Sequence, residues 1–326
     1  MTRIIRTLSI LLLLATTPAL ALAQTYPAGR PVTLVVPFTP GGPTDRVARD
    51  LAEAMRKPLG QVLLVENAAG AGGTIGTARV AKSAPDGYTV LLMHIGFATA
   101  PALYRKLQYA GASDFEAVGG VVEVPMTFVA RRDFPANTFA EFVAYAKTNK
   151  EKMNFANAGV GSASHLCGLM FQSAIQTEFQ TVPFKGAADA MTSLLGGQVD
   201  FICDQTTNTT QQILAHNIKA YGVTSKARLA TLPALPPLAE QGLPGFEVSI
   251  WHGLWVPKGT PRPVIEKLTA ALQIALKDPS FRRSMGELGA EIYSPDKGAP
   301  AAFTSFVSAE TLKWGEVIKK AGIYAD

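Results

Sequence analysis

The sequence predicts an α/β fold with a mainly parallel sheet, divided into two domains. Short β-branched apolar runs alternate with amphipathic stretches of helical spacing along almost the whole chain, as in βαβ units. Glycine-rich turns follow several of these runs and open the next helical stretch. A mature length of about 300 residues also exceeds what one compact core usually organises.

The strands and helices are expected in a regular order. The first strand covers residues 32–36, and the apolar residues Val47, Leu51 and Met55 follow it at helical spacing. The end of the chain reads as two amphipathic helices, over residues 261–277 and 299–320. Further strands are expected at residues 62–65, 89–94, 121–130, 181–184, 199–203, 220–223 and 248–256.

The N-terminus has the features of a secretory signal peptide. Arg3 and Arg6 precede an apolar run over residues 8–14, and small residues at Ala21 and Ala23 suit signal peptidase. We expect cleavage after Ala23, so that residues 1–23 are removed and the protein is periplasmic. The alternative is a retained anchor, but the apolar run falls short of the roughly 20 residues that span a bilayer.

The charge and the cysteine content exclude several classes of protein. The chain has 30 basic and 25 acidic residues, and loss of Arg3 and Arg6 leaves a balance of +3, too weak for a nucleic-acid partner. The Lys and Arg residues do not cluster into a basic stripe along the sequence. Two cysteines, Cys167 and Cys203, either pair or stay as buried thiols, and the sequence does not decide between them. The four histidines show no metal-ligand spacing, so no metal site is expected.

Two strand-like segments are long and interrupted, residues 121–130 and 249–257. We interpret them as the two crossings of an interdomain hinge, because the Pro125 region and the proline-rich approach to the second segment look like boundaries. Domain 1 then comprises residues 24–125 plus 249–326, and domain 2 comprises residues 126–248. The alternative is that both segments are ordinary strands of one sheet.

The first glycine turn runs from Val36 to Asp45 and includes Gly41, Gly42 and Pro43. Pro43 suits the first position of a helix, and glycines remove side chains and supply unusual backbone geometry, which we expect at Gly42. Bare amides and the helix dipole then form an anion site. A plain helix cap is the alternative.

Two further loops repeat this pattern. Residues 67–76 follow a predicted strand, but Ile75 stands where a dinucleotide fingerprint needs glycine, and no Walker lysine follows, so no cofactor is expected. Residues 157–166 place Gly159, Gly161 and serines before another helix, with Ser162 as the expected cap. Each loop can present amides to a carboxylate.

Asp204 ends a predicted strand, where open α/β sheets place their sites. It can form the base of a pocket, bind an amine, or only cap a helix. Together with Ser162 or Ser164 and His165 it also suggests a periplasmic serine hydrolase. The G-x-S-x-G motif of a nucleophile elbow is absent, so we expect no enzyme.

Seven strings follow one another along nearly the whole mature chain: PFTPGGPTD, ENAAGAGGTIG, APDGYTVLL, GVGSASHL, VPFKGAADAMTSLLGGQVD, WHGLWVPKGTP and KKAGIYAD. Taken in this order, they resemble the Bug family of extracytoplasmic solute receptors, which serve tripartite tricarboxylate transporters. The resemblance implies a type II periplasmic-binding-protein fold, two α/β domains with a ligand cleft between them, a small carboxylate ligand, and membrane transporter components as partners. We expect a monomer.

The resemblance also implies which residues bind the ligand. One carboxylate is held by the first two loops, through Phe38, Thr39, Gly41, Gly42, Thr44, Ala71 and Gly72. The opposite wall is Gly161, Ser162, Ala163, Ser164 and His165, with Asp204 deeper in. A further wall comes from Ile95, Gly96, Phe97 and Ala98. The family commonly lacks cysteine near these loops, so Cys167 and Cys203 are departures.

The ligand is expected to be an aliphatic or aromatic dicarboxylate. Facing helix ends suit a carboxylate at each end of the molecule, and Phe38 and Phe97 would suit an apolar body between them. Citrate-like acids, aromatic monocarboxylates and amino acids stay open as alternatives.

Overall fold

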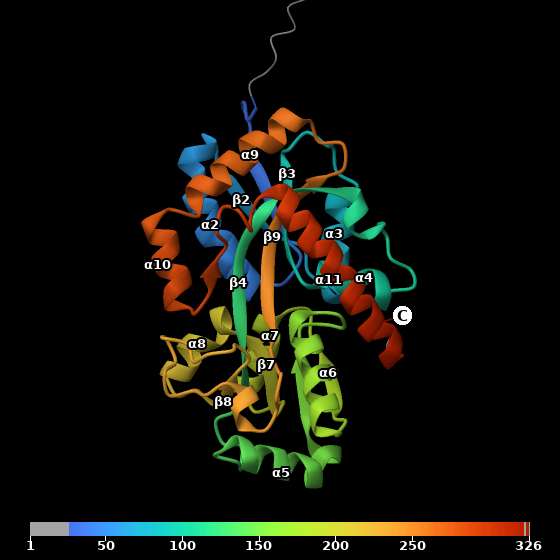
Figure 1. The fold of residues 1–326 in the computed structure, drawn as a ribbon, viewed down its shortest axis with the longest axis vertical. Helices are drawn as coiled ribbons and strands as arrows, with labels where there is room; N and C mark the ends of the chain where they lie inside the picture. The colour runs from blue at the N-terminus through green and yellow to red at the C-terminus, as the bar shows by residue number, and fades with distance from the viewer. Residues whose placement is uncertain (1–25, 323, 326) are drawn as a thin grey trace, which may run out of the picture.

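The computed structural model describes residues 26–322, 324 and 325. The predicted signal peptide lies outside these residues. Figure 1 shows an elongated molecule in which the elements gather into an upper and a lower body, joined by two long strands. We call the upper body the first lobe and the lower body the second lobe. No helix within the described residues combines the length and the apolar character needed to cross a membrane.

The first lobe is built on three parallel strands. Strand β1 lies between β2 and β3 and pairs in parallel with both. All five residues of β1 are apolar or β-branched and almost all are buried, as expected for a strand covered on both faces. The strands are β1 (Val32–Val36), β2 (Leu63–Asn67) and β3 (Thr89–His94), and the helices are α2 (Pro43–Leu59), α3 (Thr74–Ala81), α4 (Gly96–Leu103), α9 (Arg262–Ala275), α10 (Pro279–Glu287) and α11 (Pro300–Ala321).

Capping residues determine where helix α2 begins and ends. Gly42 is the N-cap, Pro43 occupies the first turn, and Gly60 ends the helix in the left-handed conformation. Val47, Leu51 and other apolar residues at helical spacing are buried against the sheet. The N-terminus of α2 is thereby fixed directly after β1, at the edge of the first lobe that faces the second.

The second lobe has its own aromatic core. Phe128 lies 4.3 Å from Phe171 and 5.5 Å from Phe201 between ring centroids, and Phe142 contacts all three rings. Its strands are β5 (Asn154–Asn157), β6 (Gln180–Pro183), β7 (Phe201–Gln205) and β8 (Ile218–Val223), and its helices are α5 (Phe139–Asn149), α6 (Ala163–Ile175), α7 (Ala187–Leu195) and α8 (Thr206–Leu214).

Strands β4 (Phe115–Arg131) and β9 (Ser249–Pro257) connect the lobes (Figure 1). They pair with each other in antiparallel fashion up to the pair Pro125 and Ser249, and β4 then continues into the second lobe beside β7 and β8. The short strand β10 (Glu291–Ile292) also pairs with β4. The sheet is therefore mixed rather than mainly parallel, because both connecting strands run against their neighbours.

Most predicted elements form, with shifted ends. Strand β3 matches its predicted range, whereas β4 begins earlier, at Phe115. Two short strands are not predicted from the sequence: β5, which has four residues with asparagine at both ends, and the two-residue β10. The described residues also form short 3₁₀ turns at Ala71–Gly73, Gly111–Asp114, Lys150–Lys152 and Leu238–Gln241.

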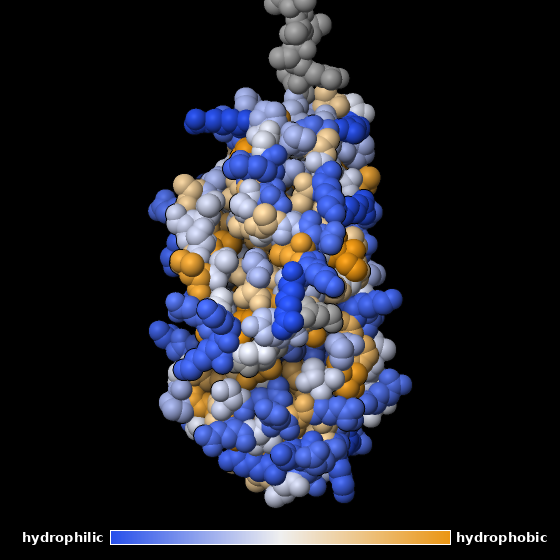
Figure 2. Space-filling view, turned by 90° about the vertical axis from the view of Figure 1, so that its right-hand side faces the viewer, coloured by the Kyte–Doolittle hydropathy of each residue, from blue (hydrophilic) through white to orange (hydrophobic). Residues whose placement is uncertain are grey.

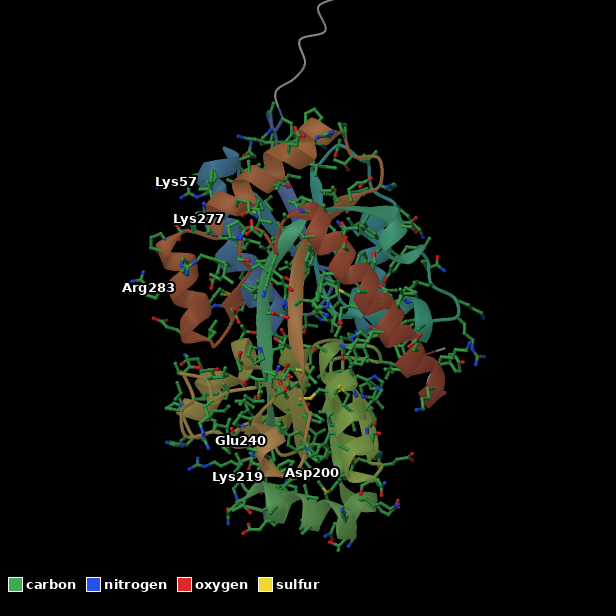
Figure 3. All side chains as sticks on the ribbon, viewed as in Figure 1. Lys57, Asp200, Lys219, Glu240, Lys277 and Arg283 are labelled. Atoms are coloured by element: carbon green, nitrogen blue, oxygen red, sulfur yellow. A yellow bond between two sulfur atoms is a disulfide. The ribbon has the colours of Figure 1, made fainter. Side chains whose placement is uncertain are left out.

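Cys167 and Cys203 form a disulfide, which the sequence had left undecided. The bond joins α6 to β7, its Cα atoms are 6.0 Å apart, and both residues are fully buried. Figure 3 shows the sulfur pair inside the second lobe. Two elements of this lobe that end at the junction between the lobes are therefore covalently tied.

Candidate functional site

A small cavity lies between the lobes, at the ends of the strands. Its open volume is about 10 Å³. Residues of the first lobe form one side and residues of the second lobe form the other. The lining residues are Phe38, Pro43, Thr44, His94, Ala158, Ser162, Ala163, Ser164, Ala187, Asp204 and Gln205.

Four helices begin at this cavity: α2, α6, α7 and α8. In α6 the N-cap Ser162 accepts a hydrogen bond from the amide of His165, as predicted. The other three N-caps, Gly42, Gly186 and Gln205, provide no side-chain cap. The first amides of those helices lack an intrahelical acceptor and point toward the N-terminal end, so the cavity is surrounded by hydrogen-bond donors and positive dipole ends.

No Lys or Arg is among the lining residues, and Asp204 is the one charged side chain among them. The charged residues labelled in Figure 3 lie on the outer parts of the two lobes, away from their junction. Figure 2 likewise shows hydrophilic side chains covering most of the free end of the second lobe. An anion in the cavity would therefore be bound by backbone dipoles and neutral donors rather than by a cation.

The first loop is held by a buried carboxylate behind it. Asp45 accepts hydrogen bonds from the Gly41 amide (2.9 Å), from Arg49 (2.8 Å) and from Asn67 (2.9 Å). Burial pushes the pKa of Asp45 upward, but the bonds from Arg49, Gly41 and Asn67 outweigh burial and lower it. The Gly41 amide is thus already engaged by Asp45, contrary to the expectation that it binds a ligand.

Gly42 does not need the backbone freedom of glycine. Its φ is −81° and its ψ is 176°, an extended conformation open to any residue. A Cβ at this position would lie 3.6 Å from the amide nitrogen of Ala188, in the first turn of α7. The expectation of unusual geometry at Gly42 is wrong, and a Cβ there would make only ordinary van der Waals contacts.

The second and third glycine loops meet each other between the lobes. Tyr104 donates to the carbonyl oxygen of Val160 at 2.7 Å, and Thr99 donates to that of Gly161 at 3.2 Å. A Cβ on Gly72 would collide with the Val160 oxygen. Gly72 therefore lies at the contact between the lobes, and neither Ala71 nor Gly72 is among the residues that line the cavity.

The residues expected to form a wall after β3, residues 95–98, do not line the cavity. Phe97 packs 4.8 Å from Trp255 and 5.1 Å from Phe115 between ring centroids, inside the core of the first lobe. Ile95 and Ala98 are equally buried, and Gly96 donates its amide to Nδ1 of His94. The residue that β3 presents to the cavity is His94, because the chain turns into α4 immediately after it.

Asp204 lies in the cavity wall, almost fully buried. Its carboxylate accepts hydrogen bonds from the Gln205 amide (2.8 Å) and from Asn208 (2.6 Å). Burial raises the pKa of Asp204 to about 6, and these two bonds offset only part of the effect. No ion pair joins Asp204 to any described residue.

The residues of the hydrolase alternative do not form a triad. Nδ1 of His165 accepts the amide of Gly161 (3.2 Å), and the hydroxyl of Ser164 accepts the amide of Ala158 (2.8 Å). Ser162 and Ser164 contact each other at 3.1 Å, but neither hydroxyl is hydrogen-bonded to the imidazole of His165. A nucleophile needs a base within hydrogen-bond reach, and here the ring and the hydroxyls are engaged by the backbone.

Three buried histidines should make the fold sensitive to acid. Burial lowers the pKa of His165 and of His252 to about 4, and burial and the neighbouring His252 lower that of His94. As pH falls below about 6.5, the unfolded chain takes up protons that the folded chain excludes. The contribution of the neutral histidines to the free energy of unfolding is therefore fully present above pH 6.5. It is lost as pH falls toward 4, by about 3 kcal/mol for His165 alone.

Urea unfolding at pH 7 and pH 4.5 measures this loss. We expect His165→Gln to unfold with a weaker pH dependence than the wild type, whereas substitution of the exposed His216 by Gln leaves the dependence unchanged. Asp204 acts in the opposite direction over part of this range, but it is present in all three proteins and cancels in the comparison. Equal pH dependence of the wild type and His165→Gln would contradict the prediction.

The sequence reasoning missed several lining residues: Pro43, His94, Ala158, Ala187 and Gln205. Ala187 follows the same pattern of strand, glycine and helix as the first loop, since β6 leads to Gly186 and α7. This pattern could identify Ala187 from the sequence. His94 is predicted only as the last residue of a strand, and no feature of the neighbouring sequence indicates that its ring faces a cavity.

A larger and shallower groove lies elsewhere, between α2, α9 and α10. It mixes acidic and basic side chains, including Glu53, Lys57, Lys277 and Asp278, and no helix N-cap of α2, α6, α7 or α8 borders it. Among the described residues there is also no group of three or more His, Cys, Asp or Glu that could bind a metal. The cavity between the lobes is therefore the candidate site.

Two α/β lobes joined by two crossing strands, with helix N-termini meeting in a cavity between them, define the two-domain fold of periplasmic binding proteins. Residues 47–323 match the family described as tripartite tricarboxylate transporter family receptor. The chain belongs to this family, and its members are solute-binding receptors rather than enzymes. The resemblance to the Bug receptors is confirmed.

Solved structures agree with this assignment. The chain is 54% identical to the periplasmic binding protein BugD, with a TM-score of 0.90, over 92% of this chain and 100% of the other. It is 39% identical to MatC from Rhodopseudomonas palustris with bound malate, with a TM-score of 0.86, over 90% and 100% of the two chains. It is 32% identical to R. palustris Rpa4515 with adipate, with a TM-score of 0.85, over 92% and 99%.

Proposed function

We propose that this protein is a periplasmic receptor that captures a small aliphatic dicarboxylate between its lobes and delivers it to the membrane components of a tripartite tricarboxylate transporter. The observation that supports it best is the meeting of four helix N-termini at one small cavity without a lining cation. Helix ends in both lobes can each bind one carboxylate. A diacid spanning the cavity would use both.

The wall of the cavity and the related proteins favour an aliphatic ligand. Only about 10 Å³ of the cavity admits the centre of a water-sized sphere, far below the roughly 300 Å³ where small-molecule sites usually begin, so the lobes have to separate to admit a ligand. Phe38 is the one aromatic side chain in the wall besides the His94 ring that it stacks on. The related proteins with bound malate and adipate support the aliphatic over the aromatic and citrate-like alternatives.

We further propose that the two lobes are domains that close around the ligand. Domain 1 comprises residues 24–125 plus 249–326, and domain 2 comprises residues 126–248. The pair of Pro125 and Ser249, where β4 leaves β9, marks the hinge. Removal of residues 1–23 would place the mature protein in the periplasm, where it would act as a monomer.

The proposed ligand-binding residues combine the predicted and the observed sets. Phe38, Thr44 and Asp204 were predicted and line the cavity, as do Ser162, Ala163 and Ser164. Six further predicted residues do not line the cavity and are kept as part of the proposal: Thr39, Gly42, Ala71, Gly72, Gly161 and His165. His94, Ala187 and Gln205 are added, and Ile95, Phe97 and Ala98 are left out.

A thermal-shift screen tests the proposal. Linear diacids of four to six carbons are compared with monoacids of the same length, which offer one carboxylate instead of two. A ligand that binds only the folded protein at a hundredfold excess over Kd stabilises it by about 2.7 kcal/mol, so the melting temperature should rise for at least one diacid and less for its monoacid. NMR of the mixture should show the acid unconsumed. No shift with any diacid, or turnover of the binding acid, would contradict the proposal.

A further inference from the structure

The groove between α2, α9 and α10 lies entirely in the first lobe and shares no lining residue with the cavity between the lobes. Its open volume is about 910 Å³, compared with about 10 Å³ in the cavity. Binding pockets usually measure about 300 to 1,000 Å³, so the groove has room for a bound segment while the lobes stay together. A second binding surface is therefore open in the same structure in which the cavity is almost closed.

Contacts between its walls hold the groove in shape. Asp50 on α2 accepts a hydrogen bond from the hydroxyl of Ser284 on α10 at 2.5 Å, and Arg46 donates to the same hydroxyl at 3.2 Å. Lys267 on α9 donates to the carbonyl oxygen of Pro58, in the last turn of α2, at 3.4 Å. The three helices are thereby connected to one another, and the groove is preformed.

The acidic side chains that line the groove are already engaged by the protein. Glu53 pairs with Arg56 at 2.8 Å, and Asp50 pairs with Arg46 at 3.1 Å. Asp278 is the N-cap of α10, where its carboxylate accepts two backbone amides of the first turn. None of these three carboxylates is left over to attract a cation from a partner.

Two lysines that line the groove are not engaged in this way. Lys57 and Lys277 are exposed, and no ion pair or side-chain hydrogen bond joins either of them to another described residue. Figure 3 shows both on the same side of the first lobe as Arg283 of α10, which is likewise exposed and without an ion pair to a described residue. The uncompensated charge at the groove is therefore positive, which is complementary to an acidic partner.

An exposed apolar side chain lies in the same groove. Ile274 on α9 lines it and is 58% exposed. A small inorganic anion would neutralise the lysines but leave Ile274 in water, and a flat membrane surface would not enter a groove. A peptide segment that combines acidic side chains with an apolar one would satisfy both features, as in other grooves that recognise short motifs.

We propose that this groove docks an acidic segment, with an apolar side chain among its Asp and Glu residues, of the membrane component of the transporter. The inference rests on the proposed function and names the surface that delivery would use. Because the groove belongs to one lobe, a partner bound there leaves the second lobe free to move away and release the ligand. Docking is therefore independent of whether the cavity is occupied.

Charge reversal in the groove tests the proposal in cells that carry the membrane components. The double variant Lys57→Glu and Lys277→Glu should lower uptake of the diacid that stabilises the wild type by about tenfold or more. The purified variant should bind that diacid with a Kd within about twofold of the wild type, since the groove and the cavity share no residue. Lys319→Glu with Lys320→Glu is the matched control, because these exposed lysines also lie in the last turn of a helix. The control should support normal uptake.

Photo-cross-linking identifies the partner segment. A benzophenone amino acid in place of Ile274 should cross-link to the membrane component, at a segment that contains Asp or Glu, with equal yield with and without the diacid. The same group in place of Leu312, which is 73% exposed on α11, should not. Replacement of the acids of that segment by Lys should restore uptake by the double variant Lys57→Glu and Lys277→Glu.

The outcomes separate the inference from the proposed function. Normal uptake by the groove variant, or an equal loss in the Lys319 and Lys320 control, would overturn the inference alone. So would binding of the wild type to phosphatidylglycerol vesicles that the groove variant loses, without a protein cross-link at Ile274, because the groove would then contact lipid. Absence of uptake with the wild type and its membrane components would overturn delivery itself and the inference with it.

Discussion

Gly72→Ala is expected to weaken ligand binding by more than a hundredfold without unfolding the protein. A Cβ at this position would collide with the Val160 oxygen and lie 2.8 Å from the Tyr104 hydroxyl, so the second and third glycine loops could not meet. Separation of the lobes would relieve the collision with the Val160 oxygen, which lies in the other lobe, and the Tyr104 side chain can shift its flexible end. Each lobe would then hold only half of the site. Calorimetry with the diacid that stabilises the wild type measures the loss.

Gly245→Ala is the matched control. Both glycines have positive φ, 60° at Gly72 and 74° at Gly245, so each alanine incurs a similar backbone strain of roughly 1 kcal/mol. Nothing lies within 4 Å of a Cβ at Gly245. Gly245→Ala should therefore bind as the wild type does. Affinity of Gly72→Ala within threefold of this control would mean that the loop contact is not needed for binding.

Phe97→Ala is expected to lower the free energy of unfolding by about 3 to 5 kcal/mol and to leave ligand preference unchanged. The ring packs against Phe115 and Trp255 with 1% of its surface exposed, so its removal leaves a cavity in the core. Urea unfolding of the free protein gives the stability. Calorimetry with a four-carbon and a six-carbon diacid gives the preference.

Phe38→Ala provides the contrast, because Phe38 is also buried but lines the cavity and stacks on His94. We expect Phe38→Ala to weaken binding as well as stability. A change in the relative affinities of short and long diacids in Phe97→Ala would show that the residue senses the ligand after all, in spite of its place in the core.

The sequence predicts the site well where chemistry is local. Gly42, Pro43 and Ser162 have the positions at helix starts that their residue types favour, and Ser162 caps α6 as expected. Apolar periodicity likewise gives β3 its correct ends. These features depend on neighbours along the chain, which a sequence shows directly.

The sequence fails where a residue's role depends on distant partners. Phe97 follows a glycine after a strand just as a ligand-facing residue would, and only Phe115 and Trp255 show that its ring belongs to the core. The sequence predicts that the amide of Gly41 binds a ligand, whereas in the structure this amide donates to Asp45. The hydroxyl of Thr44 lies 3.3 Å from Nε2 of His252, which is 208 residues away in the chain. Such tertiary contacts leave no local pattern.

The disulfide has a consequence for making the protein. Cys203 directly precedes Asp204, and Cys167 lies one helical turn beyond Ser164, so the bond fastens two walls of the cavity to each other from behind. A cytosol rich in reduced thioredoxin and glutathione would deliver the chain with both thiols free. Recombinant protein for affinity measurements should therefore be produced by secretion, since material purified from the cytosol would lack the cross-link that fixes Ser164 relative to Asp204.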